Sequence, residues 1–241
     1  MGVSELIKKL DQSSSRRIQQ ERRVFPIQPP FDLLPQLLRG AGITIQLTIF
    51  STVVAFIVAF IMGLGRLSKI RLIRWVSTIY VEFFRGTSLL VQLFWAYFVL
   101  PLWGINLTAM QAGILILGLS YGAYAAEIVR SSILAIPKSQ IEAGVALNMT
   151  QGQIMIRIII PQAVLIMLPP FGNIIIELLK GTALVSLITL SDLMFQGVMI
   201  RSTTLRTTET FSMVLLIYFV LALPITFGIR RIEGRLSKGR A

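Results

Sequence analysis

The sequence predicts an all-helical membrane protein with about five transmembrane helices. Its 241 residues have a mean hydropathy of +0.76 and are 54% hydrophobic, far above the values of a soluble domain. Several stretches reach the roughly 20 apolar residues that a helix needs to cross a bilayer. The net charge of +12 is concentrated in the segments between these stretches. This distribution excludes a nucleic-acid-binding protein, which needs its basic residues on a water-facing surface with few long apolar runs.

Five apolar runs supply the predicted spans, and basic tails flank them. The spans are residues 40–65, 75–100, 110–129, 158–179 and 211–229. They form one transmembrane domain (32–231) between a polar amino-terminal tail (1–31), which lacks the apolar core of a signal peptide, and a basic carboxy-terminal tail (232–241).

The segment 181–200 is apolar but has no uncharged run longer than eleven residues, which is too short to span. We expect a re-entrant or interfacial helix on the far side of the membrane, with a sixth span as the alternative. In the preceding span, Pro161, Pro169, Pro170 and Gly172 predict a bend.

Charged residues inside the spans occur as closely spaced pairs. Glu82 and Arg85 are three positions apart in the second span, and Glu127 and Arg130 have the same spacing at the end of the third. Side chains three apart lie on one face of a helix, so we expect both pairs to neutralise their charges as structural ion pairs.

A polar interruption of about 27 residues, 136–162, separates the third span from the fourth. Pro137 suits the first turn of a helix, and Ile141, Val145 and Met149 recur at helical spacing. The segment therefore predicts a short amphipathic helix held between two spans. Periodicity alone fits equally well a surface for a partner or a loop lying on lipid headgroups.

The residues of this interruption follow a known pattern. The pattern is Glu142-Ala143-Gly144, then Leu147-Asn148, then Ile160-Pro161. It resembles the Glu-Ala-Ala loop of ABC importer permeases, with Gly144 in place of the second Ala and Asn148 where Gly is usual. Asn tolerates a left-handed backbone best after Gly, so we expect the turn to be kept.

Further segments resemble the polar amino-acid branch of these permeases. They are residues 84–92, 122–130, 168–173 and 179–186, and the match extends from about residue 34 to residue 229. Within the branch, residues 187–193 most resemble ectoine and hydroxyectoine permeases.

The resemblance implies a type I ABC importer permease fold in a bacterial plasma (inner) membrane. Residues 137–157 would be a cytoplasmic loop that couples to an ABC ATPase. The coupling residues would be Glu142, Ala143, Gly144, Ala146, Leu147 and Asn148. A second permease subunit, identical or homologous, would complete the path, and an extracytoplasmic solute-binding protein would deliver the substrate.

The chain is not expected to be an enzyme. It has no Gly-x-x-x-x-Gly-Lys-Ser/Thr loop to hold phosphates, and no Ser/His/Asp or paired-carboxylate constellation for catalysis. It contains no Cys and no His, which excludes a thiol nucleophile and a His metal site. ATP and Mg²⁺ are therefore expected on the partner ATPase, and no cofactor or metal in this chain.

Buried polar residues are the candidates for the substrate path. Asn173 and Glu177 are four apart and share a face of the fourth span, where Glu177 either contacts a cationic solute or pairs with Lys180. Gln46 and Gln92 are candidates for the path or for hydrogen bonds between helices.

Five spans place the two ends of the chain on opposite sides. The basic loop 66–74, the coupling loop and the carboxy-terminal tail are assigned to the cytoplasm by the positive-inside rule. The amino-terminal tail then lies outside, whereas its six basic residues would favour the cytoplasm. We accept this conflict because the resemblance implies a cytoplasmic coupling loop.

Two other classes are weighed against a permease. An ion-coupled secondary transporter usually shows paired repeats with interrupted spans, and no second copy of the coupling loop or of the proline-rich span is visible. A scaffold subunit would not need the intramembrane charges of Glu82, Arg85, Glu127 and Glu177.

Overall fold

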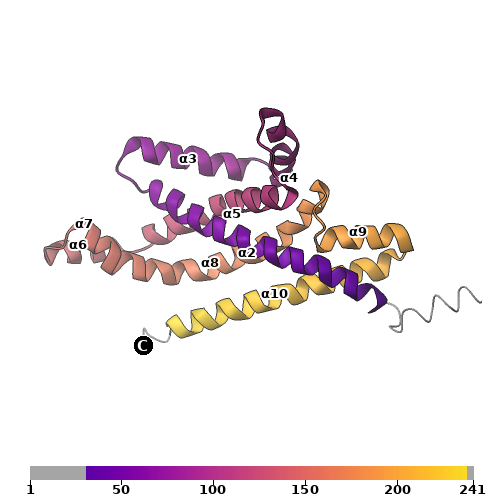
Figure 1. The fold of residues 1–241 in the computed structure, drawn as a ribbon. Helices are drawn as coiled ribbons and strands as arrows, with labels where there is room; N and C mark the ends of the chain where they lie inside the picture. The colour runs from indigo at the N-terminus through magenta and orange to yellow at the C-terminus, as the bar shows by residue number, and fades with distance from the viewer. Residues whose placement is uncertain (1–30, 238–241) are drawn as a thin grey trace, which may run out of the picture.

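The computed structural model describes residues 31–237, and within them every regular element is a helix (Figure 1). Four helices are long and apolar enough to cross a membrane, and the number is five if one bent helix pair is counted as a single span. The predicted class, all-helical with about five spans, is confirmed. The predicted amino-terminal tail lies outside the described residues apart from Phe31.

The helices follow the predicted order, with longer bounds. They are η1 (Phe31–Leu33), α2 (Leu34–Gly65), α3 (Arg71–Gly86), α4 (Leu89–Phe94), η2 (Trp95–Val99), η3 (Leu100–Trp103), α5 (Ala109–Leu134), α6 (Lys138–Ala146), α7 (Gln151–Ile154), η4 (Met155–Ile159), α8 (Ile160–Gly181), η5 (Thr182–Ile188), α9 (Leu193–Thr204) and α10 (Thr207–Ser237). Helix α10 continues to Ser237, so residues 232–237 belong to the last helix and not to a tail.

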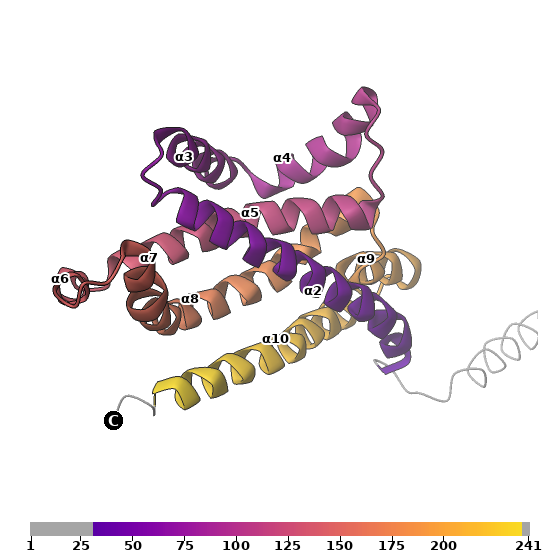
Figure 2. The ribbon, with the colours of Figure 1, turned by 60° about the vertical axis from the view of Figure 1, so that its left-hand side comes forward.

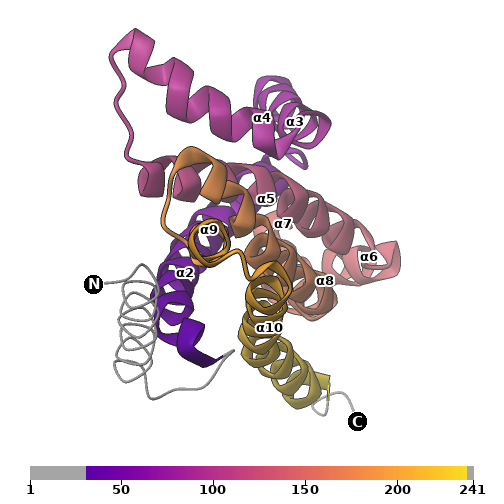
Figure 3. The same ribbon diagram turned by 90° about the vertical axis from the view of Figure 1, so that its right-hand side faces the viewer.

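The four long helices α2, α5, α8 and α10 run alongside one another (Figures 1 and 2). Helices α6 and α7 lie at one end of this bundle, together with the carboxyl end of α10, and α9 lies at the other end. Figure 3 looks from the α9 end and shows α3 and α4 to one side of the bundle. The loop 137–157 and the 181–200 segment are thus at opposite ends of the bundle, as predicted.

Helices α2 and α5 cross at small residues. A Cβ on Gly118 would lie 2.5 Å from Cγ1 of Val54, and one on Gly122 would lie 2.9 Å from Cβ of Val58. A Cβ on Gly63 would lie 2.7 Å from Cβ of Val129, so the backbones are in close contact along the crossing. In lipid such close packing, rather than hydrophobic burial, holds helices together.

The second predicted span, 75–100, is not one straight helix. Arg71–Gly86 and Leu89–Trp103 meet at an angle of 104°. Gly86 is a poor helix former, and Thr87 and Ser88 adopt extended backbone. The Gln92 side chain fixes the break, because its Nε2 donates to the Phe84 carbonyl at 3.1 Å and to Thr87 Oγ1 at 2.6 Å.

The two prolines of the fourth span do not interrupt it. Helix α8 continues through Pro169 and Pro170, and the bend expected at these prolines stays a prediction. Membrane helices tolerate proline when neighbours supply the missing bonds. The following segment forms η5 and the 12-residue α9, which is too short to span, and the sixth-span alternative is wrong.

Buried polar contacts tie together the end of the bundle near α9. Asp192 is fully buried and caps α9, accepting from the Phe195 N–H at 2.9 Å. Burial raises the pKa of Asp192 to about 6. The Arg206 guanidinium donates to Asp32 at 2.8 Å, which joins the start of α2 to the turn before α10.

We expect Gly118→Leu to destabilise the fold, because the side chain has no space at the α2–α5 crossing. Overpacking of this kind costs about 1–3 kcal/mol, which corresponds to a fall in Tm of roughly 3–10 °C. Thermal unfolding in detergent measures the change. Gly228→Leu is the control, because a Cβ at Gly228 meets nothing within 4 Å. Equal Tm values for the two variants would contradict close packing at this crossing.

Cysteine labelling tests the sidedness of the bundle, and the natural chain has no Cys that would interfere. Ser139 lies in α6 and Thr204 ends α9, and both are exposed. We expect an impermeant maleimide to label Ser139→Cys only in inverted vesicles and Thr204→Cys only in intact cells. Labelling of both from one side would contradict the arrangement of five spans.

Candidate functional site

The end of α6 closes on a left-handed Asn148. Its φ is +59°, and the N–H groups of Asn148 and Met149 donate to the carbonyls of Val145 and Gly144 at 2.9 and 3.0 Å. This is a Schellman motif, in which the residue after the helix must adopt left-handed backbone. The expectation that Asn148 keeps the turn agrees with this geometry. Thr150 then caps α7 with a capping box.

Gly144 is where α6 packs on the segment that leads into α8. A Cβ at this position would lie 2.8 Å from Cγ1 of Ile154 and 3.2 Å from Cδ1 of Ile158. Ile141 and Met149 pack into the same cluster around Ile154. Glycine at this position therefore seats α6 directly against α7 and η4.

The other face of α6 is free in this chain. Glu142, Ala143, Ala146 and Leu147 are exposed, Leu147 by 74%. Val145 is also 56% exposed. The helix packs through Gly144, and its contact face runs along Ile141 and Gly144. An exposed helix face with apolar side chains and one carboxylate is typical of a surface that binds a partner protein.

A charged network joins α2, α3 and α5 near the same end. Glu127 accepts from Arg130 at 2.7 Å, so this predicted pair is present. The predicted pair of Glu82 with Arg85 is not formed. Glu82 lies 3.4 Å from Arg66, a residue that sequence spacing did not single out and that also bonds Glu127.

Arg85 lies instead over the ring of Tyr124, with Cζ 5.5 Å from the ring centroid. A guanidinium over an aromatic face gains a cation–π interaction, which leaves Arg85 outside the carboxylate network. Tyr124 in turn is close to Tyr121, with ring centroids 6.5 Å apart.

Asn173 and Glu177 are exposed on one face of α8, as the spacing predicted. The alternative pairing of Glu177 with Lys180 is absent from the described residues, where neither side chain belongs to an ion pair. The Tyr121 hydroxyl donates to the Glu177 backbone carbonyl at 3.0 Å, which brings α5 against this part of α8. Arg85, Tyr124, Tyr121 and Glu177 thus follow one another across α3, α5 and α8.

Sequence reasoning missed the two tyrosines. The sequence feature that could have identified them is a pair of aromatic hydroxyls, three positions apart, in a run of small residues (120–126) that otherwise packs closely.

The two glutamines that were candidates for the path have different surroundings. Gln92 is buried and fixes the bend between α3 and α4, whereas Gln46 is exposed on α2 without a hydrogen bond to another described residue.

Comparison with known proteins agrees with this arrangement. Residues 51–238 match the family described as "Binding-protein-dependent transport system inner membrane component". The chain is 45% identical over 215 residues to a probable amino-acid ABC transporter permease, y4tF, of Sinorhizobium fredii, covering 87% of this chain and 90% of that one. It is 35% identical to the arginine transport system permease ArtQ of Bacillus subtilis, covering 85% and 94%.

Solved structures agree in fold. A crystal structure of an amino acid ABC transporter with histidines matches with a TM-score of 0.79 and 37% identity, over 84% of this chain and 94% of that one. The MetNI methionine ABC transporter in an inward-facing conformation matches with a TM-score of 0.73 over 87% and 99%, and at 22% identity it supports the fold alone. The chain belongs to the binding-protein-dependent transport system inner membrane components, as a multi-pass permease subunit of a polar amino-acid ABC importer.

Proposed function

We propose that this permease conducts a small zwitterionic solute past Asn173 and Glu177, and that a partner ATPase drives it through α6. The observation that carries the proposal is the mechanical connection between the two sites. Helix α6 packs through Gly144 onto Ile154, and the helical run Gln151–Ile188 that begins there contains Glu177. A force on the exposed face of α6 is therefore transmitted to the helix that holds the substrate residues.

The ATPase would contact the exposed face of α6, which consists of Glu142, Ala143, Ala146 and Leu147. Gly144 would hold α6 in place, and Asn148 would form the turn that ends it. Two ATPase subunits would hydrolyse ATP with Mg²⁺, because this chain has no phosphate-binding loop. A second permease subunit, identical or homologous, would complete the path, and a solute-binding protein would deliver the solute from outside.

The proposed path offers a partner for each charge of a zwitterion. The Glu177 carboxylate is exposed and outside any ion pair of the described residues, so it is available for the cationic group. Arg85 and the Asn173 amide are exposed as well and can meet the carboxylate. Both solute charges must be compensated when they leave water.

The solute class is a polar amino acid or a compatible solute. Relatives are named for L-cystine, glutamine and arginine, which supports the first. Ectoine and hydroxyectoine rest only on the resemblance of residues 187–193. Uptake of labelled candidates into proteoliposomes, with and without the ATPase, separates these solutes. Uptake driven by an ion gradient without ATP would instead favour the secondary transporter.

We expect Glu142→Lys to abolish coupling, because it places an unpaired positive charge in the joint with the ATPase. Uptake should fall by tenfold or more, and less ATPase should co-purify, while membrane insertion stays unchanged. Gln140→Lys is the control, since it adds a charge to the same exposed helix on a different face. Normal uptake by Glu142→Lys would remove Glu142 from the joint.

We expect Glu177→Gln to slow uptake of zwitterionic or cationic solute by about tenfold, which corresponds to roughly 1.4 kcal/mol of lost charge pairing. The affinity of the solute-binding protein and the assembly with the ATPase should not change. Glu233→Gln, on the exposed carboxyl end of α10, is the control. If Glu177→Gln matches the parent chain, the residue lies outside the path.

A further inference from the structure

The apolar face of helix α3 is used neither by the bundle nor by the proposed transport function. Only Ser77 and Val81 are buried, on the side that packs against the bundle. Around the helix, its exposed residues separate into two faces. The apolar face consists of Leu72, Trp75, Val76, Ile79 and Phe83. The polar face consists of the exposed Arg71, Arg74, Glu82 and Arg85 and the half-buried Thr78, and of these Glu82 contacts Arg66 and Arg85 contacts Tyr124.

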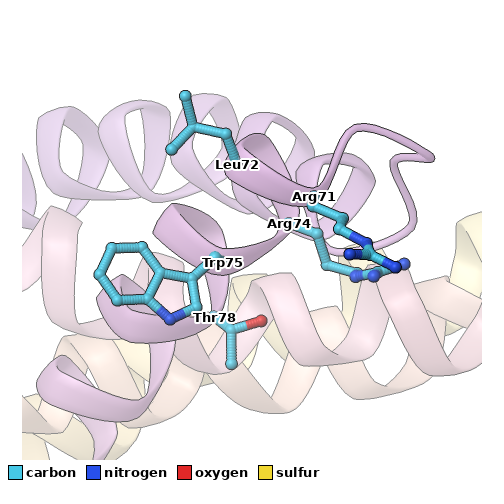
Figure 4. A pocket seen from close by; sticks show the side chains of 5 residues that line it. All are labelled: Arg71, Leu72, Arg74, Trp75 and Thr78. Carbon is cyan, nitrogen blue, oxygen red and sulfur yellow. The ribbon is translucent and has the colours of Figure 1, made fainter.

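The boundary between these faces is a shallow hollow of about 590 Å³, lined by Arg71, Leu72, Arg74, Trp75 and Thr78 (Figure 4). Figure 4 shows both arginines extending to one side of the helix and the Trp75 indole to the other. The hollow therefore combines two guanidinium groups, a hydroxyl and an apolar wall.

The positive charge of the hollow is not compensated within the described chain. Lys69, Arg71 and Arg74 form no ion pair with a described residue, and the sequence has no acidic residue between Asp32 and Glu82. Glu82 itself is taken by Arg66. Two arginines one helical turn apart repel each other unless an anion lies between them.

We propose that this hollow binds the phosphate of an anionic phospholipid in the leaflet on the coupling-loop side. Guanidinium groups bind phosphate through paired N–H donors. The first turn of α3 adds free backbone N–H groups, because Ile70 provides no side-chain cap. Trp75 is 65% exposed, and an indole at a membrane interface lies at headgroup level. The apolar face then continues along α3 as a surface for the acyl chain.

A lipid is the occupant that fits both the basic side and the apolar side of the hollow. A free phosphate would leave Trp75 and Leu72 uncovered, 65% and 68% exposed as they are. A basic residue near an anionic leaflet contributes about 1 kcal/mol, so two arginines enrich an anionic lipid by roughly tenfold or more.

Trp75 itself can report the bound lipid. The chain has three tryptophans, and Trp95→Phe with Trp103→Phe leaves Trp75 as the single indole. The full chain is reconstituted in nanodiscs of neutral phosphatidylcholine with a small fraction of brominated lipid, either phosphatidylglycerol or phosphatidylcholine. Because bromine quenches an indole on contact, the ratio of the two quenching efficiencies measures enrichment. We expect brominated phosphatidylglycerol to quench about tenfold more per mole.

The Arg71→Gln/Arg74→Gln variant should lose this preference while quenching by brominated phosphatidylcholine stays equal, which verifies that the helix remains in place. The control is Arg230→Gln/Arg231→Gln, which removes the same charge from α10 and should keep the preference. A single Arg74→Gln substitution replaces the double variant if the latter does not fold. Equal quenching by both lipids in the parent, or a preference that survives loss of the arginines, overturns the proposal.

Excess inorganic phosphate should leave the preference intact, and abolition of the preference by phosphate would assign the hollow to the free ion. If the arginine variant loses its ATPase partner while its lipid preference is unchanged, the surface is a protein contact. These measurements need no transport, so their outcome is independent of the proposed path.

Discussion

Helices in a bilayer gain little by burying apolar surface against each other, so close contact between backbones has to hold them. The crossing of α2 and α5 provides that contact through Gly63, Gly118 and Gly122. The charged network and helix α8 both contact the two helices of this crossing. Arg66 at the end of α2 reaches Glu127, and Tyr121 on α5 reaches the backbone of α8 at Glu177. The spans on either side are therefore arranged around a contact that contains no functional group.

Hydropathy located the five spans because length and apolar content are all that a bilayer requires of a helix. It could not reveal the 104° bend between α3 and α4, since a hydropathy window averages along the chain and carries no direction. The bend depends on Gln92, five residues beyond Thr87, folding back to bond it. Proline weakens a helix locally, but neighbouring elements decide whether the helix breaks, and α8 continues through Pro169 and Pro170.

The site was predictable where its geometry is local. The left-handed turn at Asn148 follows from the residue type that stands where the family has Gly. The shared face of Asn173 and Glu177 follows from their spacing within one helix. The ion-pair partners of Glu82 and Glu127 were not predictable. Arg66 lies 16 residues from Glu82 and 61 from Glu127, and it competes with the nearer arginines for these carboxylates. The packed face of α6 could not be read from hydrophobic spacing, because a glycine has no hydrophobic signal and Gly144 makes the closest contact.

The contact between Gly144 and Ile154 restricts how this loop can be exchanged between related permeases. An alanine at 144 would need a smaller residue at 154, because the Cβ and the Ile154 side chain would be only 2.8 Å apart. A chimera that transplants α6 alone would therefore combine mismatched surfaces and tilt the tip. Grafting α6 together with α7 and η4 would keep this contact, but Ile154 and Ile159 also belong to the buried cluster of Ala59 and Val129 on α2 and α5. Exchanges of this loop between related permeases should accordingly cut the chain at its spans and not inside the loop.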